Sequence, residues 1–191
     1  MLKFSHLNFF YKNKEIFKDV NLNITSNFVF LVGENGSGKT TLLNLIAQVF
    51  SFKGEILYNG KNIRKETIFY MESERLFLPK IKGKEYLKYR GTLLGLDLSE
   101  EYVTKLGEIF DLPLNLYIEN YSTGMKKKIE FIPSLFKKYS IYLFDEPLLG
   151  LDYYSSCAIQ KTIHNLINDD AIIVVSTHDV EYIKQTTCKT F

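Results

Sequence analysis

The stretch that decides the fold is Gly33-Glu34-Asn35-Gly36-Ser37-Gly38-Lys39-Thr40. A glycine, four residues, a second glycine, a lysine and a serine or threonine form the pattern of a phosphate-binding loop. The apolar run from Phe28 to Val32 predicts a buried strand before the loop, and the helical spacing of apolar residues from Lys39 to Phe50 predicts a helix after it. Because such a loop belongs between a strand and a helix, this context supports a nucleotide-binding function.

The loop is expected to hold the phosphates of ATP through its backbone and its side chains. Glycines allow a tight turn whose N–H groups point inward, and the following helix adds its positive N-terminal end. Lys39 would reach the β- and γ-phosphates, Thr40 would give its hydroxyl to Mg²⁺, and Thr41 would bond to the α-phosphate. The residues predicted to bind the nucleotide here are Asn35, Gly36, Ser37, Gly38, Lys39, Thr40 and Thr41.

A second apolar run, Ile141 to Phe144, ends in two carboxylates. A buried strand of this kind can deliver a carboxylate to the metal beside the phosphates. Asp145 is therefore predicted to hold Mg²⁺, mainly through water. Glu146 lies one residue further and suits a general base that polarises the attacking water. Together with the phosphate loop, this pair predicts hydrolysis of ATP.

Strand-like and helix-like segments alternate along the chain, which favours a parallel sheet with helical crossovers. The alternation of Val20, Leu22 and Ile24 with polar residues predicts a half-exposed antiparallel sheet near the N-terminus. A helical insertion is predicted over about residues 76–138 of a single domain covering 1–191. The predicted strands cover 7–11, 20–24, 28–32, 53–59, 67–71, 141–144 and 171–175, and the predicted helices cover 39–50, 86–94, 100–110 with Ser99 as N-cap, a segment from Ser122 toward Pro133, 152–167 and 179–186.

Composition limits the possible functions. The chain has 191 residues and a net charge of +2, so we expect no nucleic-acid partner. Its densest basic cluster, Lys126-Lys127-Lys128, is interpreted as a solvated helix face. The apolar runs are much shorter than the roughly 20 residues of a membrane span, so any membrane role needs a partner. Met1 to His6 does not resemble a signal peptide, and two cysteines make no disulfide framework.

With these elements in place, nearly the whole chain resembles the ATPase domain of ABC transporters. Tyr121-Ser122-Thr123-Gly124-Met125, hereafter the signature motif, resembles the family's Leu-Ser-Gly-Gly-Gln. In the family, the serine and second glycine contact the γ-phosphate held by the opposite subunit, and the resemblance implies this role for Ser122 and Gly124. The departures at Tyr121, Thr123 and Met125 resemble exporter-type members. A simple helix cap by Ser122 is the alternative interpretation.

Three further segments carry the resemblance. Leu148 to Asp152 is similar to the D-loop, which crosses the dimer interface, so Asp152 is implied to lie there. The segment from Ser176 to Asp179 is similar to the switch motif, which implies that His178 bonds the γ-phosphate and orients the water. Tyr11 lies 28 residues before Lys39, where the family has the aromatic residue that stacks on adenine. Lys39, Glu146 and His178 are accordingly the predicted catalytic residues.

The Q-loop is irregular. The family normally has a glutamine after a strand, where it touches Mg²⁺ and senses the membrane partner. Comparison back from Pro79 without gaps places Ser73 at that position, and a one-residue shift brings Glu72 or Glu74 there. Ser73 is the predicted metal residue, with the two glutamates as alternatives.

The resemblance implies a P-loop NTPase fold of the ABC type, with a RecA-like parallel-sheet core, a small antiparallel β-subdomain and an inserted α-helical subdomain. It implies an exporter-like ATP-hydrolysing subunit that uses ATP and Mg²⁺. Its partners would be a membrane-spanning transporter subunit and a second ATPase subunit, identical or similar. It would lie in the cytoplasm, on the cytoplasmic face of the membrane.

Three other functions fit part of the pattern. A chromosome-maintenance or DNA-repair ATPase would place long coiled coils between Lys39 and Ser122, but this gap is only 83 residues long and holds no heptads. A translation-associated ABC protein would carry two such domains in one chain. A non-hydrolysing regulatory module stays open because of the irregular Q-loop, although Glu146 and His178 disfavour it.

Overall fold

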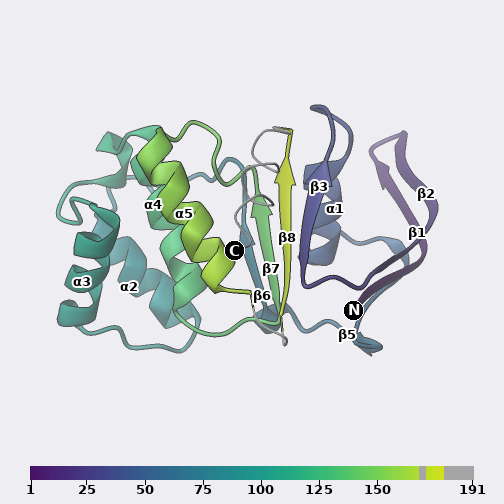
Figure 1. Cartoon of the computed structure of the whole chain (residues 1–191), viewed down its shortest axis with the longest axis horizontal. Helices are drawn as coiled ribbons and strands as arrows, with labels where there is room; N and C mark the ends of the chain where they lie inside the picture. Colours follow the sequence, from purple (N-terminus) through teal and green to yellow (C-terminus); the bar gives the residue numbers. More distant parts are fainter. Residues whose placement is uncertain (168–170, 179–191) are drawn as a thin grey trace, which may run out of the picture. The chain divides into compact units, whose positions relative to one another are not determined.

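The structure is a computed structural model that describes residues 1–167 and 171–178 (Figure 1). Contacts divide the described chain into two compact units. The first unit holds Met1–Ser73, Tyr139–Pro147 and the described residues from Asn165 onward, and the second holds Glu74–Lys138 and Leu148–His164. Each unit is thus assembled from separate stretches of sequence. The predicted helix over 179–186 lies outside the described residues.

A four-stranded parallel sheet forms the centre of the first unit (Figure 1). Its strands are β3 (Phe28–Val32), β6 (Ile68–Met71), β7 (Ile141–Asp145) and β8 (Ile172–Thr177), in the order β3-β8-β7-β6. Every residue of β7 and β8 is buried, as expected for central strands of a parallel sheet that is covered on both faces. This explains why these strands are continuous apolar runs in the sequence.

The second sheet of this unit is antiparallel and consists of β1 (Leu2–Tyr11), β2 (Lys14–Ile24), β4 (Lys53–Tyr58) and β5 (Lys61–Asn62), in the order β2-β1-β4-β5. It confirms the predicted N-terminal antiparallel pairing but extends it. Register shifts interrupt the β1–β2 ladder, and His6 and Asp19 adopt φ of 51° and 47° there. Such bulges break the period of two, so the alternation was visible only over residues 20–24.

The core of the first unit lies where α1 (Lys39–Ile46) packs with residues from both sheets. Leu43 of α1 joins Phe4 of β1 and Leu143 of β7 in one buried cluster. The helix ends before the predicted Phe50, because Gln48 adopts a left-handed backbone with φ of 57°. A short 3₁₀ turn, η1 (Lys65–Thr67), leads into β6.

The second unit is helical and contains α2 (Gly83–Leu93), α3 (Glu100–Phe110), η2 (Ile118–Asn120), α4 (Thr123–Phe131), η3 (Ile132–Leu135) and α5 (Tyr153–Asn165), whose last residue is assigned to the first unit. Ser99 caps α3 as predicted, accepting a 3.2 Å hydrogen bond from the N–H of Tyr102. Pro133 lies in η3, where the α-helix has already given way to a 3₁₀ turn.

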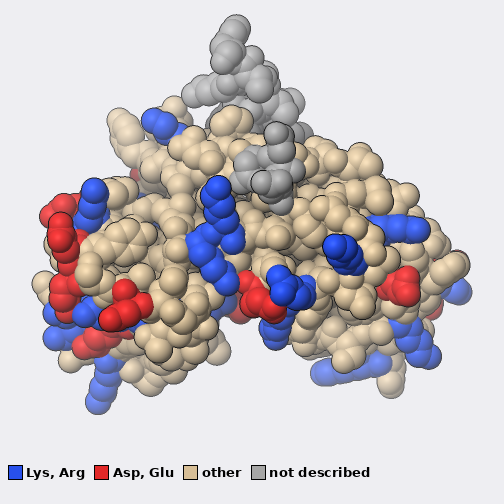
Figure 2. Space-filling model, turned by 90° about the horizontal axis from the view of Figure 1, so that it is seen from below, with Lys and Arg blue, Asp and Glu red and all other residues tan. Residues whose placement is uncertain are grey.

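The prediction of a solvated lysine face on α4 is wrong for Lys127, whose exposed fraction is 6%. Successive helix residues point about 100° apart, so three consecutive lysines cannot all share one solvated face, and Lys127 is the one that is buried. On the face drawn in Figure 2, basic side chains are interspersed with acidic ones. Among the described residues, no helix is both long enough and apolar enough to cross a membrane.

Candidate nucleotide-binding and catalytic site

The glycine-rich loop connects β3 to α1 in the first unit. Gly36 and Gly38 adopt φ of 80° and 95°, a left-handed backbone that glycine takes without the penalty of a Cβ atom. The N–H of Ser37 donates to the carbonyl of Glu34 at 3.2 Å, and Gly38 is the N-cap of α1. Asn35 and Ser37 are exposed. The loop therefore presents open backbone and a helix N-terminus, which suit an anionic ligand.

Lys39 turns back over this loop. Its Nζ donates hydrogen bonds to the carbonyl of Gly33 at 2.6 Å and to the carbonyl of Glu34 at 3.1 Å. Nζ also lies 3.9 Å from Oε1 of Glu146, and the lysine side chain is 8% exposed. A buried ammonium group that is bonded mainly to carbonyl oxygens can exchange them for phosphate oxygens, which form stronger charge-assisted bonds.

Asp145 is fully buried at the end of β7, and hydroxyl groups from two other elements bond to it. Thr40 Oγ1, on α1, donates to Oδ2 of Asp145 at 2.8 Å, and the hydroxyl of Ser176, on β8, donates to Oδ1. This oxygen set fits Mg²⁺, which is often bound by one or two carboxylates together with substrate phosphates and water. Within the described residues, no cluster of three or more His, Cys, Asp and Glu side chains is suited to a metal. When ATP is bound, phosphate oxygens and water could serve as further ligands.

Glu146 and His178 form the next part of the cluster. Glu146 has a left-handed backbone with φ of 47°, and its N–H donates to Ser176 through the hydroxyl at 3.0 Å and the carbonyl at 3.3 Å. Its Oε1 lies 2.9 Å from Nδ1 of His178. The carboxylate is 13% exposed and the imidazole 43% exposed. A carboxylate oriented by a histidine at the edge of solvent is placed to accept a proton from water.

Ser176 is the residue whose role the sequence did not reveal. It is completely buried, and it contacts both Asp145 and Glu146. In the sequence it stands out only as the first residue of the segment that contains His178. Its position at the end of an otherwise apolar strand was the available signal, because a buried hydroxyl needs hydrogen-bond partners.

Tyr11, the predicted adenine platform, lies at the end of β1 and is 53% exposed. Its ring makes an edge contact with Phe50, with centroids 6.3 Å apart. The sequence did not indicate that side chains of β2 lie beside the glycine-rich loop. A Cβ atom on Gly38 would lie 3.4 Å from the ring of Phe17 and 3.5 Å from Ile16. These two apolar side chains border the start of α1.

Ser73, the predicted Q-loop residue, follows shortly after β6 and is half-buried, as is Glu72, whereas Glu74 is exposed. Ser73 and Glu72 belong to the first unit and Glu74 to the second. None of these positions decides which residue completes a metal shell. The assignment of Ser73 therefore stays a prediction.

Ser122, in the second unit, is the N-cap of α4. Its Oγ accepts a 3.2 Å hydrogen bond from the N–H of Met125. Cap geometry is compatible with both interpretations of this serine, because a helix N-terminus can also face a phosphate. Gly124 lies in the first turn, and a Cβ on it would make ordinary contact with Leu151 at 3.5 Å. The signature motif and the D-loop segment thus pack together within this unit.

Asp152 begins α5. Its Oδ1 accepts from the N–H of Ser155 at 2.9 Å, and its Oδ2 accepts from the hydroxyl of the same serine at 2.6 Å. These bonds, the hydroxyl's first, hold the pKa of Asp152 below its usual value. The carboxylate is therefore a helix cap within its own chain, which leaves its predicted place at a dimer interface untested.

The structure brings five predicted residues into one cluster in the first unit, namely Lys39, Thr40, Asp145, Glu146 and His178. Ser122, Gly124 and Asp152 lie in the second unit. The cluster combines a phosphate-type loop, an acidic strand end and a histidine, which is the chemistry needed to hydrolyse a nucleoside triphosphate.

Comparison with known proteins identifies the family. The family model of ABC transporters matches residues 17–149. This chain belongs to the ABC transporter family. It is an ATP-binding protein with an ATPase activity coupled to transport, and the predicted P-loop NTPase fold is confirmed. ATP-binding subunits of ABC transporters dimerise and work with membrane-spanning subunits.

Several relatives define the similarity of this ABC protein. It is 34% identical over 187 residues to the cytochrome c biogenesis ATP-binding export protein CcmA of Reclinomonas americana, covering 92% of this chain and 83% of that protein. It is 31% identical to the ABC transporter ATP-binding protein YtrB of Bacillus subtilis over 90% of this chain, but spans only 61% of that protein. A putative ABC transporter ATP-binding protein from Pyrococcus furiosus has a TM-score of 0.79 at 28% identity, covering 93% of this chain and 91% of that one.

Proposed function

We propose that this chain is the ATP-hydrolysing subunit of an ABC transporter that exports its substrate. It would work by closing head-to-tail with a second copy, or with a similar chain, around two ATP molecules. The observation that carries the proposal is the cluster in which Lys39 and His178 both lie near the carboxylate of Glu146. A binding module would not need a carboxylate placed between an ammonium group and an imidazole.

Each residue of the cluster has a chemical task. Glu146 accepts the proton of the attacking water, and His178 holds this carboxylate and orients the water. Lys39 leaves the loop carbonyls for the phosphate oxygens and stabilises the charge that develops on them. Thr40 and Asp145 would hold Mg²⁺, which neutralises phosphate charge when it is bound.

The second subunit would complete each site. Ser122 and Gly124 of one chain would contact the γ-phosphate held by the other, and Asp152 would lie beside them at the interface. Tyr11 would stack on adenine. Ser73 would complete the metal shell, with Glu72 or Glu74 as the alternatives. The full chain would act as one ATPase domain with a helical subdomain over about residues 76–138, a proposal that the contact-defined second unit supports.

Export and location are parts of the same proposal. The residue types at Tyr121 and Met125 and the word "export" in the name of the Reclinomonas relative support export. A relative from Saccharolobus solfataricus is named a phosphate import protein, so family membership alone does not set the direction. A membrane-spanning partner would hold the chain on the cytoplasmic face of the membrane.

Replacement of Glu146 by Gln tests this function, because it removes the base but keeps the shape of the side chain. ATP should still bind, turnover should fall at least about 100-fold, and ATP should trap a stable dimer. Measurements of phosphate release and of sedimentation with ATP would show both effects. Glu119→Gln, at an exposed residue of η2, is the matched control and should change neither.

Two results would contradict the proposal. Turnover that is undiminished in the Glu146→Gln variant would remove this residue from the role of base. A variant that binds ATP but stays monomeric at all protein concentrations would remove nucleotide-driven closure from the mechanism.

A further inference from the structure

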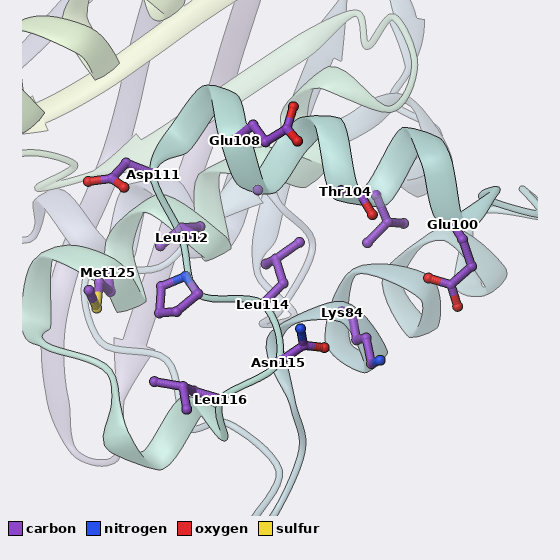
Figure 3. Close-up of a pocket in the computed structure, with 13 residues that line it drawn as sticks. Lys84, Glu100, Thr104, Glu108, Asp111, Leu112, Leu114, Asn115, Leu116 and Met125 are labelled. Carbon is purple, nitrogen blue, oxygen red and sulfur yellow. The ribbon is translucent and has the colours of Figure 1, made fainter.

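A pocket of about 970 Å³ opens on the second unit, between α3, the start of α2 and the segment 111–116 (Figure 3). We call it the α3 pocket. Figure 3 shows Leu112, Leu114 and Leu116 in its middle and Met125 at one side. Met125 is the last residue of the signature motif, so the pocket borders the surface that the proposed dimer would bury.

Carboxylates surround this apolar floor. Figure 3 shows Glu108 and Asp111 at the edge of the α3 pocket, and both residues are exposed. Within the described part of the chain, neither side chain forms an ion pair, whereas Glu100 is bonded to Lys88 at 2.6 Å. The residues that line the pocket include three carboxylates, those of Glu100, Glu108 and Asp111, and one lysine, Lys84, so the lining carries a net negative charge. The α3 pocket therefore suits an apolar group that is flanked by positive charge.

The turn between β1 and β2 offers that combination. We call residues 10–14 the hairpin tip, in which Lys12 has φ of 54° and Tyr11 pairs with Lys14. Phe10 is 54% exposed, and Tyr11 is 53% exposed. No described residue forms an ion pair with Lys12 or Lys14, both of which are exposed. An open aromatic ring thus lies beside two ammonium groups whose charge is not met within the described chain.

We propose that the hairpin tip of one copy docks in the α3 pocket of a second copy when ATP closes the dimer. Phe10 would cover the leucines, and Lys12 and Lys14 would face Glu108 and Asp111. This inference rests on the proposed head-to-tail dimer. The hairpin tip carries Tyr11, the proposed adenine contact, and the α3 pocket is lined by Met125 of the signature motif. Docking of the tip in the pocket would therefore extend the proposed dimer interface beside the adenine.

Charge complementarity of this kind acts mainly on the rate and specificity of association. Each exposed ion pair changes an affinity by at most about fivefold, and salt weakens the effect. Reversal of two charges replaces attraction by repulsion at both ends of a symmetric dimer. We therefore expect a dissociation constant that is raised at least about tenfold at low ionic strength, and less at high ionic strength.

The experiment uses the full chain with Glu146→Gln and measures the ATP-dependent dimer dissociation constant by sedimentation at low and high salt. One variant carries Lys12→Glu and Lys14→Glu, and another carries Glu108→Lys and Asp111→Lys. Each should dimerise weakly alone. Their equimolar mixture should regain the parental affinity, because both contacts of the mixed dimer then pair opposite charges.

Matched controls make the same charge changes elsewhere. One control variant carries Lys61→Glu and Lys65→Glu, at positions on β5 and η1. The other carries Asp97→Lys and Glu119→Lys, at positions that do not line the α3 pocket. All four control positions are exposed. The controls should weaken the dimer much less, and mixing them should restore nothing.

The outcomes separate the two proposals. If the Glu146→Gln chain without further changes does not dimerise with ATP, both the proposed function and the proposed docking are overturned. If the parent dimerises but the mixture does not regain affinity, or the controls weaken it equally, only the docking is overturned. If the Glu108→Lys and Asp111→Lys variant dimerises normally but loses a co-purifying membrane subunit, that subunit occupies the α3 pocket instead.

Discussion

Thr40 and Asp145 lie 105 positions apart in the sequence, yet the hydroxyl of one donates a 2.8 Å hydrogen bond to the carboxylate of the other. The bond joins the start of α1 to the end of β7 across neighbouring elements of the first unit. It places a hydroxyl and a carboxylate beside the glycine-rich loop before any nucleotide arrives. The position of both groups can therefore be tested independently of dimerisation.

Asp145→Asn should abolish most of the magnesium-dependent ATPase activity. The amide lacks the negative charge, and its NH₂ group cannot accept from Thr40 or Ser176. We expect turnover to fall about 100- to 1,000-fold, measured by phosphate release over a range of Mg²⁺ concentrations. Asp97→Asn, at an exposed position, is the control. An Asp145→Asn variant with parental magnesium dependence would place the metal elsewhere.

Tyr11→Ala should weaken ATP binding by about 1–3 kcal/mol if the ring stacks on adenine as aromatic residues stack on nucleic-acid bases. Tyr11→Phe keeps the flat ring and should bind normally. The measurement is equilibrium titration with a fluorescent ATP analogue. Tyr89, which is 45% exposed on α2, gives a matched Tyr89→Ala control. Equal affinities for Tyr11→Ala and the control would exclude Tyr11 as the adenine contact.

Arg75→Leu should destabilise the second unit because of its ion pair with Glu130. The atoms Nε and Oε1 are 2.9 Å apart, and the two side chains are 23% and 4% exposed. Removal of the arginine takes a charge-assisted hydrogen bond away from a buried carboxylate, which costs about 2 kcal/mol of unfolding free energy. Urea denaturation would measure it.

Lys88→Leu is the comparison for this ion pair. Its bond to Glu100 is shorter, at 2.6 Å, but the side chains are 40% and 69% exposed. Solvent screens such a pair, so the loss should be much smaller than for Arg75→Leu. The double change Arg75→Leu with Glu130→Leu should recover part of the lost stability. Equal losses in Arg75→Leu and Lys88→Leu would show that burial does not decide the strength of these pairs.

Tyr121 should make the free energy of unfolding depend on pH in the alkaline range. Burial raises its pKa from 10.0 to about 12, and its hydroxyl donates to the carbonyl of Pro113 at 3.0 Å. Because the folded pKa exceeds the unfolded one, the stabilisation is complete below pH 10 and is lost as pH rises through about 12. The stability advantage over Tyr121→Phe should shrink across this range in urea denaturation. An advantage that is constant with pH would contradict the assignment.

The glycine loop, the acidic strand end and the alternation of elements predicted an α/β fold and placed Lys39, Thr40, Asp145 and Glu146 together, whereas His178 and the ABC-type fold came from the family resemblance. Contiguous signals carried that prediction, because Asp145 and Glu146 follow an apolar strand directly. The role of Ser176 could not be predicted, since it depends on β8 lying beside β7 in the sheet. The burial of Lys127 depends equally on which face of α4 packs inward, and three identical residues give no sign of it.

The capped Asp152 has a consequence for assembly. Both of its oxygens are already bonded to Ser155, so the D-loop enters α5 with its terminal conformation set inside a single chain. In the proposed dimer, a loop fixed in this way would be preorganised, and little conformational entropy would remain to be lost when the second subunit meets it. The rate at which two chains join should then depend on their collision and orientation and not on the folding of this segment.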